Sequence, residues 1–169
     1  HQLEDVLRRH ARATRSTAKA EAIRALEAVK IRNPEERYHA YPFELSGGMC
    51  QRIVIAIALA CDPHILISDE PTTGLDITTQ KAVMDLVCGL IRERGMSSIL
   101  ITHDLGMAAQ YCDRIVVMKD GAIVETGKPE ALFFSPQHAY TRALLSALPE
   151  NATGDRLPTV SDFAEAGGF

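Results

Sequence analysis

Two short apolar segments on either side of a helix constrain the fold of this chain more than any other feature. The segments are 64–68 and 97–102, and each runs directly into charged or polar residues. Between them, Asp76 can cap the start of a helix with apolar residues along one face, and Gly95 can end that helix. A strand, a helix and a second strand in this order predict an α/β sheet. Open α/β sheets bind ligands at the carboxyl ends of their strands, so we expect the functional residues there.

The other segments predict further helices and one hairpin. Residues 49–61 are apolar nearly all round, which predicts a buried helix, and residues 32–44 contain two X-Pro steps that favour a loop. Asp120-Gly121 between two apolar stretches is the strongest short hairpin signal in the sequence. Helices are also predicted over 1–15, over 16–31, from Pro129 and over 137–148, before a polar tail that we expect to be loose.

Composition and charge favour a cytoplasmic globular protein. The chain has 169 residues, of which 46% are apolar and 24% charged, as in an ordinary soluble domain. Its longest apolar run, 53–61, is about half of the roughly 20 residues that a membrane span requires. We see no basic segment followed by an apolar one, the pattern of a secretory signal. The first 40 residues carry nine Lys or Arg against six Asp or Glu, an excess too small to predict a nucleic-acid partner.

The cysteines indicate the same compartment. They show neither a C-x-x-C pair nor the spacing of metal ligands with histidine. We therefore expect buried free thiols in a reducing environment. The four positions are Cys50, Cys61, Cys88 and Cys112.

Asp69 and Glu70, directly after the first strand, are the strongest chemical signal. Because successive residues of a strand point to opposite faces, the two carboxylates can serve separate roles. One can hold Mg²⁺ directly or through water, and the other can polarise an attacking water. The pattern is typical of a Walker B strand, and the alternative is an acidic turn that only ends the strand.

Ser46-Gly47-Gly48 opens the apolar helix and is the second signal. The first backbone N–H groups of a helix are free, and the helix dipole makes that end positive, so the segment suits a phosphate. The alternative is an ordinary serine cap after a flexible turn.

His103 follows the second strand and is the third signal. We expect it beside the strand that delivers Asp69 and Glu70, where an imidazole can reach a terminal phosphate and hold a water. The alternative is a structural histidine.

In their order along the chain, these motifs resemble those of the ATP-binding-cassette (ABC) ATPases. Residues 45–51 resemble the family signature, 65–70 its Walker B strand, 74–76 its D-loop and His103 its switch histidine. The resemblance runs from about residue 41 to residue 127. It implies an α/β fold that is part of a P-loop NTPase, an ABC-type nucleotide-binding domain with a helical signature subdomain.

The resemblance also implies residue roles, with ATP and Mg²⁺ as cofactors. In the family, dimers hold nucleotide between the P-loop of one subunit and the signature of the other, so a second nucleotide-binding subunit, identical or different, is an expected partner. The resemblance implies that Asp69 binds Mg²⁺, that Glu70 is the general base and that His103 contacts the γ-phosphate and the attacking water. It also implies that Asp76 lies at the dimer interface. The residues that would complete the ATP site of the opposite subunit are Ser46, Gly47, Gly48 and Gln51.

Two further stretches resemble the dipeptide, oligopeptide and nickel importer branch of this family. Residues 41–46 lead into the signature as in that branch, and residues 127–149 resemble its C-terminal extension, although two ordinary packed helices are the alternative. This branch implies a subunit that couples MgATP hydrolysis to import of peptides or nickel. It implies peripheral attachment at the cytoplasmic face of the membrane, transmembrane permease subunits as partners, and an indirect link to a substrate-binding protein.

The sequence departs from the family in one main respect, because it contains no G-x-x-x-x-G-K-[ST] motif. The nearest candidate, 121–128, has five residues between its glycines, continues into Pro129 and lies in the predicted hairpin. The Q-loop and the adenine-stacking aromatic residue are also missing, and no cysteine cluster follows Cys112. We therefore expect a C-terminal portion of the subunit with little ATP affinity alone and with an uncovered sheet edge and apolar surface.

These observations predict four parts of the chain. They are a helical subdomain with the signature at 1–61, the C-terminal part of the ATPase core at 62–127, the transporter-type extension at 128–149 and a loose tail at 150–169. Two alternative functions stay open at this point. One is an ABC protein of DNA repair or translation, and the other is a catalytically inactive truncated module.

Overall fold

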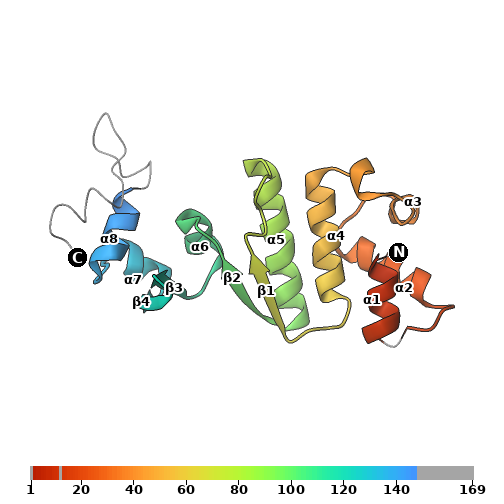
Figure 1. Cartoon of the computed structure of the whole chain (residues 1–169), viewed down its shortest axis with the longest axis horizontal. Helices are drawn as coiled ribbons and strands as arrows, with labels where there is room; N and C mark the ends of the chain where they lie inside the picture. Colours follow the sequence, from red (N-terminus) through yellow and green to blue (C-terminus); the bar gives the residue numbers. More distant parts are fainter. Residues whose placement is uncertain (1, 12, 148–169) are drawn as a thin grey trace. The chain divides into compact units, whose positions relative to one another are not determined.

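The protein forms two compact units, His1–Ile101 and Thr102–Phe169 (Figure 1). The computed structural model describes residues 2–11 and 13–147. The predicted loose tail at 150–169 lies outside the described residues. Within the described residues, no helix is both long enough and apolar enough to cross a membrane.

The first unit is mainly helical. Its predicted N-terminal helices are present but shorter than expected, and the predicted loop at 32–44 contains two short helical turns. The unit's helices are α1 (Gln2–His10), α2 (Ala18–Ala28), α3 (Pro34–Arg37), the 3₁₀ turn η1 (Pro42–Glu44), α4 (Gly47–Leu59) and α5 (Ile77–Arg94).

Strands β1 (Ile65–Asp69) and β2 (Ser97–Ile101) pair in parallel, as the strand–helix–strand order requires. Residue pairs run from Ile65 opposite Ser97 to Asp69 opposite Ile101. Figure 1 shows α5 next to these strands, then α4, then α1 and α2. Leu66 is buried in the core shared with α4 and α5.

The opposite face of the β1–β2 pair is apolar and open. Its isoleucines are about half exposed, whereas parallel sheets are usually covered on both faces. Within the first unit, the hydrophobic core does not include these side chains, and the uncovered apolar surface expected from the sequence stays a prediction for the whole chain. The four isoleucines, which we call the isoleucine face, are Ile65, Ile67, Ile99 and Ile101.

Helix α4 is not buried all round, so that prediction is wrong. Ile55, Ala56 and Leu59 are buried against α1, α2 and α5. Val54, on another side of the helix, is 56% exposed and lines an open pocket. The neighbouring helices cover one side of α4, and an apolar sequence cannot specify how many neighbours will surround it.

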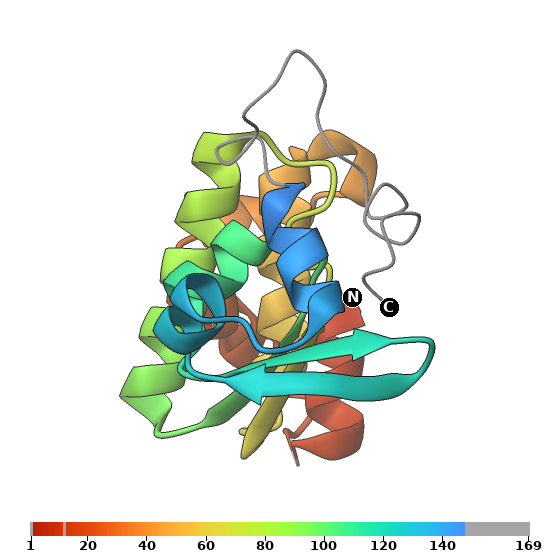
Figure 2. The ribbon, with the colours of Figure 1, turned by 90° about the vertical axis from the view of Figure 1, so that its left-hand side faces the viewer.

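The second unit contains the predicted hairpin. Strands β3 (Ile115–Lys119) and β4 (Ala122–Gly127) are antiparallel and turn at Asp120 and Gly121, both with positive φ. Two positive φ values in a two-residue turn are typical of hairpins. Figure 2 shows the hairpin with the short helices on one side of it. The helices are α6 (Leu105–Tyr111), α7 (Pro129–Phe134) and α8 (Ala139–Ser146).

The four cysteines are free thiols, as predicted, but they are not buried. Cys61 is exposed, and Cys50, Cys88 and Cys112 are half-buried. Cys61 lies just after α4 ends, beside Asp62 with its positive φ of 46°, so the backbone turn carries it to the surface.

Candidate functional site

Ser46 caps the N-terminus of α4. Its Oγ accepts a hydrogen bond from the Met49 N–H at 3.3 Å, and its carbonyl accepts the first helical bond from the Cys50 N–H at 2.9 Å. The amides of Gly47 and Gly48 precede that bond and have no acceptor within the helix. Ser46 and Gly47 are exposed. The serine cap and the anion site predicted for this segment are thus compatible. The Ser46 hydroxyl caps α4, and the positive N-terminus of the helix still faces solvent, where an anion can bind.

The two glycines of this segment also pack against the start of α5. A Cβ added at Gly47 would lie 3.3 Å from Leu75 Cδ2, and one added at Gly48 would lie 2.7 Å from Thr79 Cγ2. The second distance is shorter than carbon atoms tolerate. The structure therefore brings the predicted signature and the predicted D-loop together within the first unit.

Asp76 caps α5 and is bound to Thr79 twice. Its Oδ2 accepts from the Thr79 hydroxyl at 2.6 Å, and its Oδ1 accepts from the Thr79 N–H at 3.0 Å. The hydroxyl bond and then the amide bond lower the pKa of the Asp76 carboxyl, so it is ionised at neutral pH. The side chain is exposed and open to a partner.

Asp69 and Glu70 lie at the carboxyl end of β1, as predicted. Asp69 is exposed, opposite Ile101 of β2. Glu70 has a positive φ of 45°, which is uncommon for a residue with a side chain and is typical of functional sites when the surroundings enforce it. The Glu70 N–H donates to the Ile101 carbonyl at 2.9 Å, and the Thr73 hydroxyl donates to Glu70 Oε2 at 3.3 Å. These bonds hold the backbone and the carboxylate in place.

The structure offers Asp69 as a single metal ligand. Among the described residues, no three His, Cys, Asp or Glu side chains gather as a metal site. Mg²⁺ at nucleotide sites takes one or two carboxylates and fills its other positions with phosphate oxygens and water. An exposed Asp69 at a strand end fits that role, and nucleotide would have to supply further ligands.

His103 belongs to the second unit, so its predicted position beside Asp69 and Glu70 stays a prediction. It is exposed and follows the end of β2. The turn that holds it is well defined, because the Asp104 N–H donates to Thr102 Oγ1 at 3.0 Å and Asp104 Oδ1 caps α6 through the Met107 N–H.

Thr73 and Thr79 are the neighbours that sequence reasoning did not identify, whereas Leu75 belongs to the predicted D-loop at 74–76. Thr79 had a visible signal, because a threonine three residues after a capping aspartate can bind it. The contacts of Thr79 with Gly48 and of Leu75 with Gly47 had no such signal, because each joins residues about thirty positions apart.

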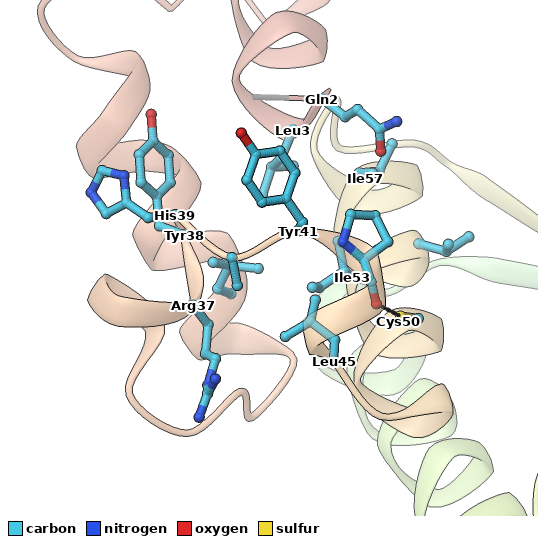
Figure 3. Close-up of a pocket in the computed structure, with 14 residues that line it drawn as sticks. Gln2, Leu3, Arg37, Tyr38, His39, Tyr41, Leu45, Cys50, Ile53 and Ile57 are labelled. Atoms are coloured by element: carbon cyan, nitrogen blue, oxygen red, sulfur yellow. Dashed lines mark hydrogen bonds between the residues drawn. The ribbon is translucent and has the colours of Figure 1, made fainter.

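A separate pocket of about 320 Å³ lies beside α4 in the first unit (Figure 3). Its walls include Leu3, Tyr38, Tyr41, Ile53 and Ile57. The Cys50 thiol faces it and donates to the Pro42 carbonyl at 3.5 Å. Ser46, Gly47, Gly48 and Gln51 do not line this pocket, although Leu45 and Cys50 of the predicted signature do.

Comparison with known proteins was made against families, curated sequences and solved structures. Residues 1–73 match the family described as "ABC transporter", and residues 124–165 match "Oligopeptide/dipeptide transporter, C-terminal region". Glutathione import ATP-binding protein GsiA of Escherichia coli O1:K1 is 48% identical over 149 residues, 88% of this chain and 24% of that protein. Dipeptide transport ATP-binding protein DppD of Haemophilus influenzae is 47% identical over 153 residues, 90% of this chain and 46% of that protein.

A solved structure is similar as well. The dimeric ATP-binding cassette MJ0796, in a post-hydrolysis state bound to ADP and Pi, superposes with a TM-score of 0.59 at 32% identity. The match covers 69% of this chain and 49% of that one. The chain thus spans between about a quarter and a half of the length of these relatives.

Proposed function

The chain belongs to the ABC transporter ATPases, in the branch that carries the oligopeptide/dipeptide transporter C-terminal region, and from this premise we propose that it forms part of the ATP-hydrolysing subunit of a peptide importer. The fold is the predicted one, a partial α/β P-loop NTPase of the ABC type. Peptides are favoured over nickel because the relatives are named for import of glutathione and of dipeptides. The same C-terminal region argues against an ABC protein of DNA repair or translation.

One observation carries the proposal most strongly. The open N-terminus of α4 and the exposed Asp76 loop abut each other through Gly48 and Thr79. The free amides of the helix end suit a phosphate brought by a second subunit, and the exposed Asp76 carboxylate suits a hydrogen-bond donor of that subunit. Ser46, Gly47, Gly48 and Gln51 would complete the partner's ATP site, and Asp76 would contact that partner.

Asp69, Glu70 and His103 have the other proposed roles. Asp69 would bind Mg²⁺, and bound MgATP would supply the phosphoryl group that is transferred to water. Glu70, held by Thr73 and by its backbone bond to Ile101, would accept the proton of the attacking water as general base. His103 would orient that water and contact the terminal phosphate.

The proposed partners and location follow from the same branch. We propose a second nucleotide-binding subunit, transmembrane permease subunits at the cytoplasmic face of the membrane, and an indirect link to a substrate-binding protein. We also propose the division into a signature subdomain at 1–61, ATPase core at 62–127 and transporter extension at 128–149. No nucleic-acid partner is proposed.

The test measures ATP binding and hydrolysis by the chain alone and mixed with an ABC subunit that has a P-loop. We expect no hydrolysis by the chain alone, since the backbone amides and lysine of a P-loop supply most of the phosphate binding. Mixing is expected to produce activity at the shared site. Robust hydrolysis by the chain alone, or none on mixing, would contradict the half-site proposal.

A charge substitution sharpens this test. Ser46→Asp keeps a good helix cap but places a negative charge where phosphate would bind, so we expect activity of the mixture to disappear without loss of stability. Thr17→Asp, which adds the same charge before α2, is the matched control and should leave activity unchanged. Equal effects of the two substitutions would argue against an anion site at Ser46.

A further inference from the structure

We propose that Thr79 is a positioning residue that couples Asp76 to the signature helix α4 through a close contact with Gly48. This inference rests on the proposed function, because it concerns how the signature is placed for the partner's nucleotide. The geometry carries it: one face of the Thr79 side chain is bound by Asp76, and the other lies against the backbone of Gly48.

The hydroxyl of Thr79 is held firmly. It donates to Asp76 Oδ2 at 2.6 Å, while the Thr79 N–H donates to Asp76 Oδ1 at 3.0 Å. Threonine branches at Cβ, so fixing Oγ1 also fixes the direction of Cγ2. Rotation of the side chain away from Gly48 would break the bond to Asp76.

The methyl of Thr79 limits what can stand at position 48. Outside its own helix, Cγ2 is the one atom among the described residues within 4 Å of a Cβ built on Gly48, at 2.7 Å. Gly48 lies in the first turn of α4 and has no positive φ, so its backbone suits any residue. Glycine is therefore required there for space next to Thr79 and for no conformational reason.

The contact gives Asp76 an influence on the signature. Asp76 is exposed, so a partner that binds its carboxylate would compete with the Thr79 hydroxyl. Release of that hydroxyl frees the methyl to turn away from Gly48. The N-terminus of α4, with the amides of Gly47 and Gly48, then loses the support that positions it.

The proposal predicts that the effect of Gly48→Ala depends on Thr79. With Thr79 present, the new methyl clashes, and we expect kcat of the assembled ATPase to fall by about tenfold with little change in KM. In the Gly48→Ala/Thr79→Ser double variant the Cγ2 methyl is gone and the hydroxyl is kept, so we expect recovery to within about threefold. Gly48→Ala/Thr79→Val has no hydroxyl to bind Asp76, so even if its methyl groups turn away from the new methyl at position 48, kcat is expected to stay low because the coupling to Asp76 is lost.

Two single variants separate the hydroxyl from the methyl. Thr79→Val removes the bond to Asp76 and is expected to lower kcat, whereas Thr78→Val, at the exposed neighbouring threonine, is the matched control and should leave it unchanged. Rescue of Gly48→Ala by Val as well as by Ser, no rescue by Ser, or wild-type kcat in Thr79→Val would overturn the proposal.

A second readout needs no ATPase and uses the chain alone. We expect Asp76→Asn and Thr79→Val to shift the amide NMR signals of Gly47 and Met49, and Thr78→Val to leave them in place. Unshifted signals would overturn the coupling. If the signals shift but the mixture has no activity, the contact is real and the proposed function has failed.

Discussion

At the scale of single residues, two carboxylates show how contacts decide what an acidic side chain does. Glu70 is held by the Thr73 hydroxyl and by a backbone bond to Ile101 in a conformation with positive φ. Glu125 of β4 instead accepts from the N–H groups of Gln137 at 2.7 Å and His138 at 3.1 Å, which ties the α7–α8 connection to the hairpin. Glu70 is held at the end of β1, where we propose that it acts as the general base, whereas Glu125 links two elements of the second unit.

Glu70→Gln tests the proposed general base. Glutamine keeps the shape of the side chain and can still accept from Thr73, but it cannot take a proton from water. We expect turnover of the full-length ATPase to fall by about 100-fold or more, with ATP binding retained. Steady-state hydrolysis and nucleotide titration measure the two effects. Persistent turnover would show that Glu70 is not the base.

Glu125 predicts an acid-sensitive second unit. Burial raises the pKa of Glu125. The Thr141 hydroxyl, which lies nearby but does not form a regular hydrogen bond, and the amides of Gln137 and His138 together lower this pKa more strongly, so it lies below its ordinary value. A carboxyl whose pKa is lower when folded stabilises the protein above its unfolded pKa, and that stability is lost as pH falls through the folded pKa.

The measurement is the stability of the chain from neutral pH down into the acidic range. Glu125→Gln is expected to be less stable than wild type at neutral pH. As the pH falls, its free energy of unfolding should decrease less than that of wild type. Glu130→Gln, at an exposed site on α7, is the control and should follow the wild-type profile. Parallel profiles for wild type and Glu125→Gln would contradict the assignment.

At the scale of elements, the ends of the helices determine how the site is built. Helices α4, α5 and α6 each begin at a side-chain cap, from Ser46, Asp76 and Asp104. Helix α5 ends at Gly95 with φ of 63°, a left-handed conformation that lets the chain turn into β2. Local caps thus define where the strands begin and where the functional side chains stand.

Gly89 lies inside α5 and Gly95 caps its C-terminus, and alanine is expected to have opposite effects at the two positions. Neither would place a new Cβ within 4 Å of another atom of the described residues, so packing is not involved. Gly95→Ala would force alanine into a left-handed conformation and should destabilise the chain by about 1 kcal/mol. Gly89→Ala, in the helix interior, should stabilise it by roughly 0.5–1 kcal/mol. Chemical denaturation of both variants measures the difference, and changes of the same sign would contradict the capping argument.

At the scale of the whole molecule, the isoleucine face is an exposed apolar surface of the first unit. Ile65, Ile67, Ile99 and Ile101 are between 49% and 64% exposed on one side of the β1–β2 pair. Exposed apolar surface of this kind promotes association, and the chain spans at most about half of its relatives' length.

Ile67→Lys tests that idea on the chain alone. A charge at the centre of the face should reduce self-association and binding of an apolar dye, with little effect on stability because the side chain is 64% exposed. Ile77→Lys is the control, because Ile77 is 84% exposed but lies outside the isoleucine face. Sedimentation velocity compares the three proteins. An equal decrease in both variants would mean that net charge, and not this face, controls association.

The sequence by itself determined the features that depend on residues close together in the chain. The caps at Ser46 and Asp76, the end of α5 at Gly95, the Asp120-Gly121 hairpin and the family signature all rest on short spacings, because their hydrogen bonds and dihedral angles are local. Tertiary structure decided the rest. Only packing shows that one side of α4 stays open, that the Glu70 backbone is held by Ile101, and that Thr79 stands against Gly48. Those contacts join residues separated by about thirty positions, and a pattern in the sequence carries no distance between them.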